Sequence, residues 1–425
     1  MHKNLLLFCI ALILCGFSYA EIKEIKGYSL GKCFLETVSR SESLAYEEEK
    51  VVQAEEQYSQ ALSLLFPKLG GSLSYSRADA SVTPAPDSTT FKLTASQSLF
   101  NGFRVLNAFK KSGLQLSNQK LAYDWAYSLL YTDLSQSFFL VLYLEKEKQL
   151  LEEQSLIFEK RLRELKERLR VGRSRSTEVL SFEISMALLK TQIVQLKMQT
   201  DTARNYFSFI SGLDKSTKLI EKDKEVLPTL KSFAEYKKRI ELRPDVLASK
   251  EAIRIASVAV EIAESTKWFP DIDLNGNYYL QRPSPYQNVA WDVQLLLTLP
   301  VFLNYNAQSK VKEMSSVQRQ AEIAYAQLVK RAEDEVENTY KNLVAENEQI
   351  KMLVGAIELA EKNVNTIVQD YTFGLSNNLE VLQAMNSLID LKRNLNKQRY
   401  AYKTDYERLQ SLVNSVPIKL VNGEK

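Results

Sequence analysis

Histidine and cysteine, the side chains most often used in acid–base catalysis, nucleophilic attack and metal binding, are scarce in this sequence. The chain has 425 residues but only one histidine and three cysteines. His2, Cys9 and Cys15 lie in an N-terminal segment that we expect to be removed, which leaves only Cys33. Histidine is the commonest general base and metal ligand, and one cysteine cannot form an intrachain disulfide. We therefore predict a protein that is not an enzyme, has no cofactor or metal site, and keeps Cys33 as a small buried residue.

The N-terminal segment is typical of a secretory signal. It has a basic start, an apolar run from Leu5 to Phe17, and small residues at Ser18 and Ala20 where a signal peptidase would cut. We interpret residues 1–20 as a signal peptide. Two alternatives stay open, namely lipidation of Cys15 and an uncut anchor, although the apolar run is short for a membrane span. No later run approaches twenty apolar residues, so we expect no transmembrane helix in the rest of the chain.

Two long stretches with helix-forming composition dominate the chain, from Arg104 to Arg170 and from Leu303 to Thr372. At 1.5 Å per residue each helix would be roughly 100 Å long. The second stretch belongs to a repeat, because Phe100 and Phe302, Gly172 and Gly374, and Val179 and Val381 are each 202 residues apart. A period this long indicates a duplicated half of the molecule and not a solenoid.

The repeat divides the chain into five parts. We predict the signal peptide at 1–20, a first repeat at 21–212, a charged connector at 213–240, a second repeat at 241–416 and a short tail at 417–425. The first repeat would begin with one helix from about Leu30 to Leu65, and each repeat would then contain two strands and a long helical hairpin. The net charge of +3, from 55 basic and 52 acidic residues, gives no indication of a nucleic-acid partner.

Four stretches of alternating polar and apolar residues, two in each repeat, predict half-buried strands. The following apolar residues share one face of these strands: Leu73, Tyr75, Phe91, Leu93, Ile272, Leu274, Tyr278, Trp291, Val293, Leu295 and Leu297. No amphipathic helix is free to cover this face. Strands of about ten residues with aromatic residues near their ends match a transmembrane β-barrel, with tips at Pro84/Pro86 and Pro283/Pro285.

Four strands cannot close a barrel around an opening, and an open sheet edge is not viable in lipid. Several copies of the chain must therefore combine. Two copies would give eight strands, about enough for side chains to fill the interior, whereas three give twelve strands and leave a bore. A trimer is thus expected.

Heptad spacing on the long stretches predicts antiparallel helical hairpins. Ile350, Ile357, Val364 and Tyr371 recur every seven residues. Matching positions in the first repeat include Leu151, Phe158 and Leu165, and the returning helix carries Val381, Leu388, Leu395, Tyr402 and Leu409. This pattern is typical of a narrow apolar seam between two helices.

The sequence resembles the TolC family of outer-membrane channel proteins over essentially the whole mature chain. The resemblance depends on the duplicated order of elements, on Phe66-Pro67 and Phe269-Pro270 before the odd strands, on Ser98-Leu99-Phe100-Asn101-Gly102 and Leu299-Pro300-Val301-Phe302 after the even strands, and on glycine turns followed by Glu-Val-Leu. It implies a mainly α fold with a small β part: a homotrimer with a twelve-stranded barrel in the lipid of the outer membrane of a Gram-negative bacterium and a twelve-helix α-barrel in the periplasm. The implied partners are a periplasmic adaptor and an inner-membrane transporter of the RND, ABC or MFS type.

The resemblance also implies roles for the two glycine turns at the inner end of the helices. The expected adaptor-docking residues are Val171, Gly172, Arg173, Ser174, Phe373, Gly374, Leu375 and Ser376. The expected gate residues are Tyr371, Glu380, Glu178, Ser376 and Gln383, although Ser376 and Gln383 depart from the family pattern of an arginine and a second acid. For Glu380 a capping box with Asn377 is an equal alternative.

The sequence therefore predicts a non-enzymatic exit duct for a tripartite efflux pump or a type I secretion system. It would pass small molecules or polypeptides from the periplasm to the outside. No phosphate-binding glycine loop is present in the sequence, so energy would come from the inner-membrane partner. A periplasmic coiled-coil scaffold or adaptor that never enters the membrane, and an exported enzyme, are the alternatives from other classes.

Overall fold

The computed structural model describes residues 27–77, 87–221, 227–283, 286–301 and 305–416. The expectations for the signal peptide, for Pro84, Pro86, Pro285 and Phe302, and for the tail at 417–425 lie outside the described residues.

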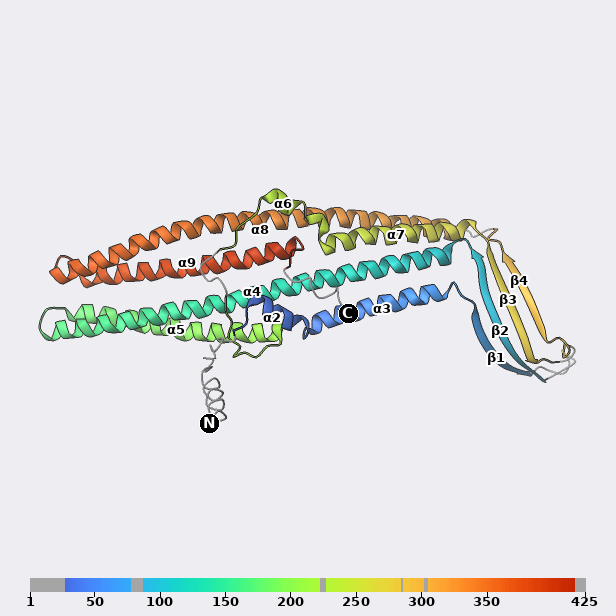
Figure 1. Cartoon of the computed structure of the whole chain (residues 1–425), viewed down its shortest axis with the longest axis horizontal. Coiled ribbons are helices and arrows are strands. Elements are labelled where there is room, and N and C mark those ends of the chain that lie inside the picture. The colour runs from blue at the N-terminus through green and yellow to red at the C-terminus, as the bar shows by residue number, and fades with distance from the viewer. Residues whose placement is uncertain (1–26, 78–86, 222–226, 284–285, 302–304, 417–425) are drawn as a thin grey trace, which may run out of the picture.

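The chain folds into two similar halves, each with a strand pair at one end and a long helical hairpin at the other (Figure 1). The first half contains α2 (Leu30–Val38), α3 (Glu42–Ser63), β1 (Lys68–Arg77), β2 (Asp87–Asn101), α4 (Arg104–Arg170) and α5 (Ser176–Ser211). The second half contains α6 (Phe233–Lys237), the 3₁₀ helix η1 (Ile240–Leu242), α7 (Pro244–Trp268), β3 (Asp271–Gln281), β4 (Trp291–Thr298), α8 (Asn306–Phe373) and α9 (Asn378–Leu412). The predicted fold class and the duplicated architecture are confirmed.

One helical prediction is wrong. The single helix expected from Leu30 to Leu65 is broken into α2 and α3 between Val38 and Glu42. Ser41 adopts an extended backbone conformation, and its hydroxyl accepts a hydrogen bond from Leu44 N at 3.3 Å. A serine at this position caps the new helix and makes the break favourable.

The long helices pair through the predicted seam. α4 packs on α5 and α8 packs on α9, while α3 and α7 lie beside α4 and α8 nearer the sheet (Figure 1). Seam residues such as Phe158, Leu165, Ile350 and Val381 are buried, between 0% and 5% exposed. The heptad prediction is therefore confirmed, and each hairpin is stabilised mainly by apolar burial along one stripe.

Helix α5 has apolar residues on two sides. Among the described helices, α5 is the one that could cross a membrane by length and composition alone. Phe182 and Leu189 on one side are buried against the core, whereas Leu180, Ile184 and Leu188 on the other are 56–62% exposed. The second side was overlooked because the seam accounts for only half of the apolar residues.

Polar contacts join the first hairpin to the second. Glu147 of α4 is 3% exposed and accepts a hydrogen bond from Arg393 Nε of α9 at 2.5 Å. Tyr131 OH of α4 donates to Glu407 Oε2 of α9 at 2.5 Å. Buried polar groups must find partners, so these matched pairs fix how far one hairpin is shifted along the other.

The four strands form one antiparallel sheet in the order β1-β2-β3-β4. β1 and β4 are its two edges. Strand β2 passes directly into α4 through Gly102 and Phe103, both at φ 63°. A Cβ on Gly102 would lie 2.5 Å from the Cβ of Phe269, so glycine is required there by both space and conformation.

An aromatic cluster and an ion pair hold this junction. Phe100, Phe103 and Phe269 pack edge to face, with ring centroids 5.4–6.1 Å apart. Arg104, the first residue of α4, pairs with Asp271, the first residue of β3. The sheet is therefore tied to the start of the long helix without an intervening flexible loop.

Near the middle of the molecule, Arg243 is fully enclosed. Its side chain is 2% exposed, donates to Asp245 at 3.0 and 2.8 Å and to Glu335 at 3.1 Å, and lies 5.0 Å from the Trp125 ring. It thus connects α7, α8 and α4.

We expect Arg243→Gln to lower the free energy of unfolding by about 3 kcal/mol, because two carboxylates lose their buried counter-ion. Arg254→Gln, whose side chain is 61% exposed and pairs with Glu251, should change it by less than about 1 kcal/mol. Guanidinium-induced unfolding followed by circular dichroism compares the two variants. Equal midpoints would contradict a structural role for the Arg243 cluster.

Candidate functional site

The functional candidates gather at opposite ends of the chain. The α4–α5 turn and the α8–α9 turn lie side by side at one end, and the sheet lies at the other (Figure 1).

The two turns have the same backbone geometry. Gly172 and Gly374 have φ values of 75° and 78°. In each turn the next residue donates its N–H five residues back: Arg173 to the carbonyl of Arg168 at 2.8 Å, and Leu375 to that of Asp370 at 2.9 Å. A Cβ on either glycine would meet no atom within 4 Å, so the left-handed conformation alone requires glycine.

Tyr371 lies buried between two arginines of the other hairpin. Its side chain is 7% exposed, and the guanidinium carbons of Arg161 and Arg168 lie 4.4 and 4.8 Å from its ring centroid. Each cation–π contact of this kind contributes about 0.5–2 kcal/mol. Tyr371 therefore holds the end of α8 against α4.

Arg161 and Arg168 were not among the residues expected from the sequence. They are seven residues apart on α4, which places them on one side of the helix, although the spacing does not say that this side meets α8. That spacing was the available signal. Nε and Nη2 of Arg161 are buried without a hydrogen-bond partner among the described residues.

The side chains of the two acidic gate candidates, Glu380 and Glu178, form hydrogen bonds within their own turns. Glu380 accepts from Ser376 Oγ at 2.6 Å, and its N–H donates to Asn377 Oδ1 at 3.0 Å. Glu178 accepts from Ser174 Oγ at 2.6 Å in the first turn. Asn377 thus caps α9 as in one half of a capping box, the alternative to a gate role, and its side-chain amide also donates to Glu380 Oε1 at 2.8 Å.

A hollow of about 900 Å³ separates the two turns. It brings together predicted residues from both hairpins and arginines that the sequence did not single out. Its lining comprises Glu167, Arg168, Val171, Arg173, Arg175, Glu178, Tyr371, Thr372, Phe373, Gly374, Ser376 and Asn377. Gln383 is exposed and does not line the hollow.

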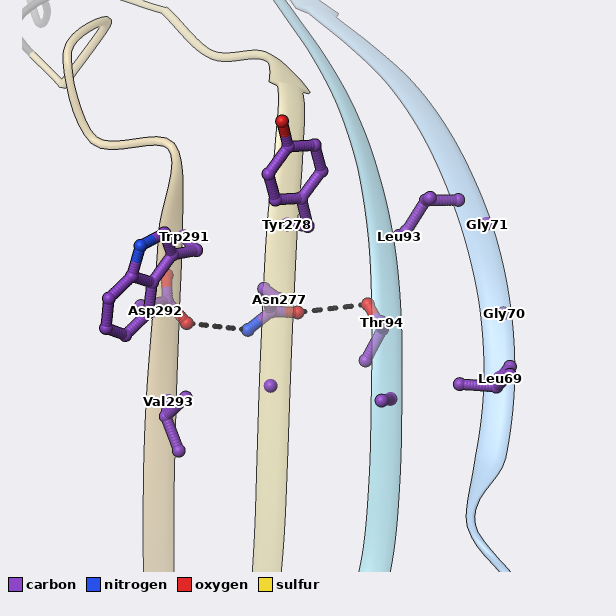
Figure 2. A pocket seen from close by; sticks show the side chains of 12 residues that line it. Leu69, Gly70, Gly71, Leu93, Thr94, Asn277, Tyr278, Trp291, Asp292 and Val293 are labelled. Atoms are coloured by element: carbon purple, nitrogen blue, oxygen red, sulfur yellow. Dashed lines mark hydrogen bonds between the residues drawn. The ribbon is translucent and has the colours of Figure 1, made fainter.

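The sheet places the predicted apolar residues in register across four strands. Gly71, Leu93, Tyr278 and Trp291 are successive partners in one row, and Gly276 lies beside Ala95 and Val293 in the next. Small residues between large ones leave a shallow hollow on the sheet, whose lining Figure 2 shows. Most of the apolar side chains here are strongly exposed, for example Trp291 at 65% and Leu295 at 64%.

Polar residues occupy the alternate positions of the same strands. Thr94 Oγ1 donates to Asn277 Oδ1 at 3.0 Å, and Asn277 Nδ2 donates to Asp292 at 2.8 Å, which gives a hydrogen-bonded row across β2, β3 and β4 (Figure 2). The sheet is thus two-sided, with one apolar and one polar face.

Among the described residues, neither end of the chain has a group of side chains that could form a metal centre. The described part of the chain contains no group of three histidine, cysteine or carboxylate side chains that could hold a metal ion. Cys33 is buried in α2, and burial raises the pKa of its thiol to about 12. The thiol is therefore protonated and unreactive at neutral pH.

Comparison with known proteins gives a family match and a set of similar structures. The sequence model of a family described as outer membrane efflux protein matches residues 36–213 and, a second time, residues 236–415. No curated protein sequence matches the chain.

Three of the similar structures illustrate the shared fold. CusC, from a study of folding and transmembrane channel formation, has a TM-score of 0.80 and 20% identity, covering 90% of this chain and 91% of its own. The outer membrane protein VceC of Vibrio cholerae has a TM-score of 0.79 and 17% sequence identity, and the match covers 90% of this chain and 95% of VceC. The MtrE outer membrane channel of Neisseria gonorrhoeae has a TM-score of 0.79 and 18% sequence identity, and the match covers 91% of this chain and 89% of MtrE. At these identities the likeness establishes the fold.

We expect Cys33 to react with iodoacetamide at pH 8 on the order of a thousandfold more slowly in the folded protein than after denaturation. With a pKa of about 12 only about 10⁻⁴ of the thiol is ionised, against about a quarter for a free cysteine. Peptide mass spectrometry measures the labelled fraction, and Cys33→Ser gives the background. Rapid labelling of the folded chain would contradict a buried, unreactive Cys33 and would favour an active thiol.

Proposed function

The chain belongs to the outer membrane efflux protein family, and we propose that three copies of it form the exit duct of a tripartite efflux pump or a type I secretion system. The family is one of transport channels of the Gram-negative outer membrane, not of enzymes. The duct would pass small molecules or polypeptides delivered from the periplasm. Its two repeats, at 21–212 and 241–416, would each contribute two strands and one helical hairpin to the wall.

The observation that carries this proposal is the uncovered sheet. Among the described residues no helix packs extensively on its apolar face. Its long apolar side chains are 36–71% exposed at Leu73, Leu93, Leu274, Tyr278 and Leu297. Exposing so much apolar surface to water is unfavourable, whereas the acyl chains of a membrane would cover it. The polar face would then line the water-filled path.

The open edges of the sheet support assembly from several copies. In lipid every backbone N–H and C=O must be paired, so the edges at β1 and β4 require strands from neighbouring chains. Three copies would give a twelve-stranded barrel with a bore, while two would give an interior filled by side chains. Three copies therefore suit a duct.

The helices support the same assembly. Two helices expose apolar side chains although the seam side of each is already buried. These side chains are 56–72% exposed: Leu180, Ile184 and Leu188 on α5, and Met352 and Leu359 on α8. A second apolar stripe on a paired helix is expected where hairpins meet side by side in a closed wall. Six hairpins from three chains would form a tube about 100 Å long.

The inner end of the tube would carry the partner contacts and the gate. We assign docking of a periplasmic adaptor to Val171, Gly172, Arg173, Ser174 and to Phe373, Gly374, Leu375, Ser376. Val171, Phe373 and Leu375 are 61%, 78% and 79% exposed at the tips, as a docking surface requires. An inner-membrane transporter of the RND, ABC or MFS type would supply the energy.

Tyr371 is assigned as the gate residue. Because it packs between Arg161 and Arg168, it would keep the second hairpin close to the first and narrow the inner opening. The shape of the two turns would be held by hydrogen bonds of Glu178, Glu380 and Ser376. Gln383, one turn further along α9, is the last of the proposed gate residues.

We expect Leu295→Arg to reduce the amount of protein assembled in the outer membrane at least tenfold. A charge on the lipid-facing side near the bilayer centre costs about 2–4 kcal/mol. Gln294→Arg, one residue away on the polar side of the same strand, is the matched control and should assemble normally. Membrane fractions analysed for heat-resistant trimers measure both. Normal assembly of Leu295→Arg would favour a periplasmic scaffold that never enters lipid.

We expect Tyr371→Ala to raise the single-channel conductance of purified protein in planar bilayers, because the link between α8 and α4 is lost. Tyr371→Phe keeps the ring between the two arginines and should resemble the native protein. An unchanged conductance in Tyr371→Ala would remove this residue from the gate. The absence of any conductance and of any crosslinkable trimer in the native protein would contradict the duct itself.

A further inference from the structure

The hollow between the two turns is lined by three arginines that lack acidic partners. Arg168, Arg173 and Arg175 all border it. None of the three forms an ion pair with a carboxylate anywhere in the part of the chain that the structure describes. By contrast, basic residues just outside the hollow are paired, as in Lys166 with Glu183 at 2.7 Å.

The two carboxylates of the hollow are directed elsewhere. Glu167 pairs with Arg170 at 3.2 Å, and Glu178 accepts a hydrogen bond from Ser174 at 2.6 Å. Arg168 lies over the Tyr371 ring, a contact that leaves its positive charge in place. The charge of the three arginines is therefore only partly offset.

The helix dipoles do not change this balance. Two helices, α4 and α8, end at the hollow and two, α5 and α9, begin there. The partial charges at these ends are about half an elementary charge and opposite in sign, so they roughly cancel in each hairpin. The arginine side chains determine the sign of the potential.

Apolar side chains surround the charged hollow. Val171, Phe373 and Leu375 are 61–79% exposed on the same two turns. A free inorganic anion would satisfy the arginines but leave these side chains in water. A protein segment that combines carboxylates with apolar side chains would fit both features, because a guanidinium binds a carboxylate through two parallel hydrogen bonds.

We propose that the hollow receives one or more carboxylate side chains from the tip of a periplasmic partner protein, with apolar residues of that tip covering Val171, Phe373 and Leu375. This inference rests on the proposed docking of the turns and adds the charge of the partner to it. Arg173 and Arg175 are the main contacts, since Arg168 also packs on Tyr371.

The probe for this proposal is a synthetic helical-hairpin peptide whose turn carries glutamate between leucine and valine. Matched peptides carry glutamine or lysine in place of glutamate. Fluorescence anisotropy measures their binding to the purified full chain in lipid nanodiscs. We expect the glutamate peptide to bind at least tenfold more tightly than either matched peptide, with the difference reduced in about 0.5 M salt by screening.

Variants of the chain locate the binding. Arg173→Gln and Arg175→Gln should each weaken binding of the glutamate peptide several-fold and leave binding of the glutamine peptide unchanged. Arg163→Gln is the control, because Arg163 is exposed on α4 and does not line the hollow. It should bind both peptides as the native chain does.

Three results would overturn the proposal. The first is equal binding of the three peptides. The second is displacement of the glutamate peptide by millimolar inorganic phosphate with no preference for the apolar flanks. The third is loss of the trimer in Arg173→Glu, which would place the arginines against a second copy. Conductance of the native protein is recorded in parallel. A conducting trimer without a charge preference rejects only this inference, whereas a chain that neither conducts nor assembles rejects the duct.

Discussion

The unpaired edges of β1 and β4 constrain everything else in the molecule. A membrane offers no water to hydrogen-bond their N–H and C=O groups, and each unsatisfied group costs several kcal/mol. The chain therefore cannot be stable in the outer membrane by itself. The helical hairpins lie along one direction, and apolar side chains of α5 and α8 stay exposed where neighbouring copies would pack, so the single chain is elongated (Figure 1).

Within one chain, two kinds of contact have separate tasks. Apolar seams hold each hairpin together, but a narrow apolar stripe tolerates sliding. Polar pairs between the hairpins, such as Glu147 with Arg393 and Tyr131 with Glu407, are satisfied in one alignment only. The seams therefore contribute most of the stability, and the polar pairs determine how the halves are aligned.

The sequence predicted the elements that depend on periodicity. The repeat, the extent of α4, the heptad seam and the two faces of the strands all follow from spacing, and the structure contains them. It did not predict features that depend on contacts across the fold. Predicting the break at Ser41 would have required the position of α2 against α4. Predicting the Arg161–Tyr371–Arg168 stack would have required knowing that α8 lies on that side of α4. The second apolar stripe of α5 was hidden because one stripe already explained the helix.

The direct passage from β2 into α4 makes the long helix a lever. Its pivot, at Gly102 and Phe103, is held by packed rings and by the Arg104–Asp271 pair, and its far end is the turn at Gly172. Over about 100 Å, a tilt of one degree at the pivot displaces the turn by about 2 Å. Small adjustments beside the membrane are thus magnified at the periplasmic tip, and a load on the tip returns to the sheet as torque.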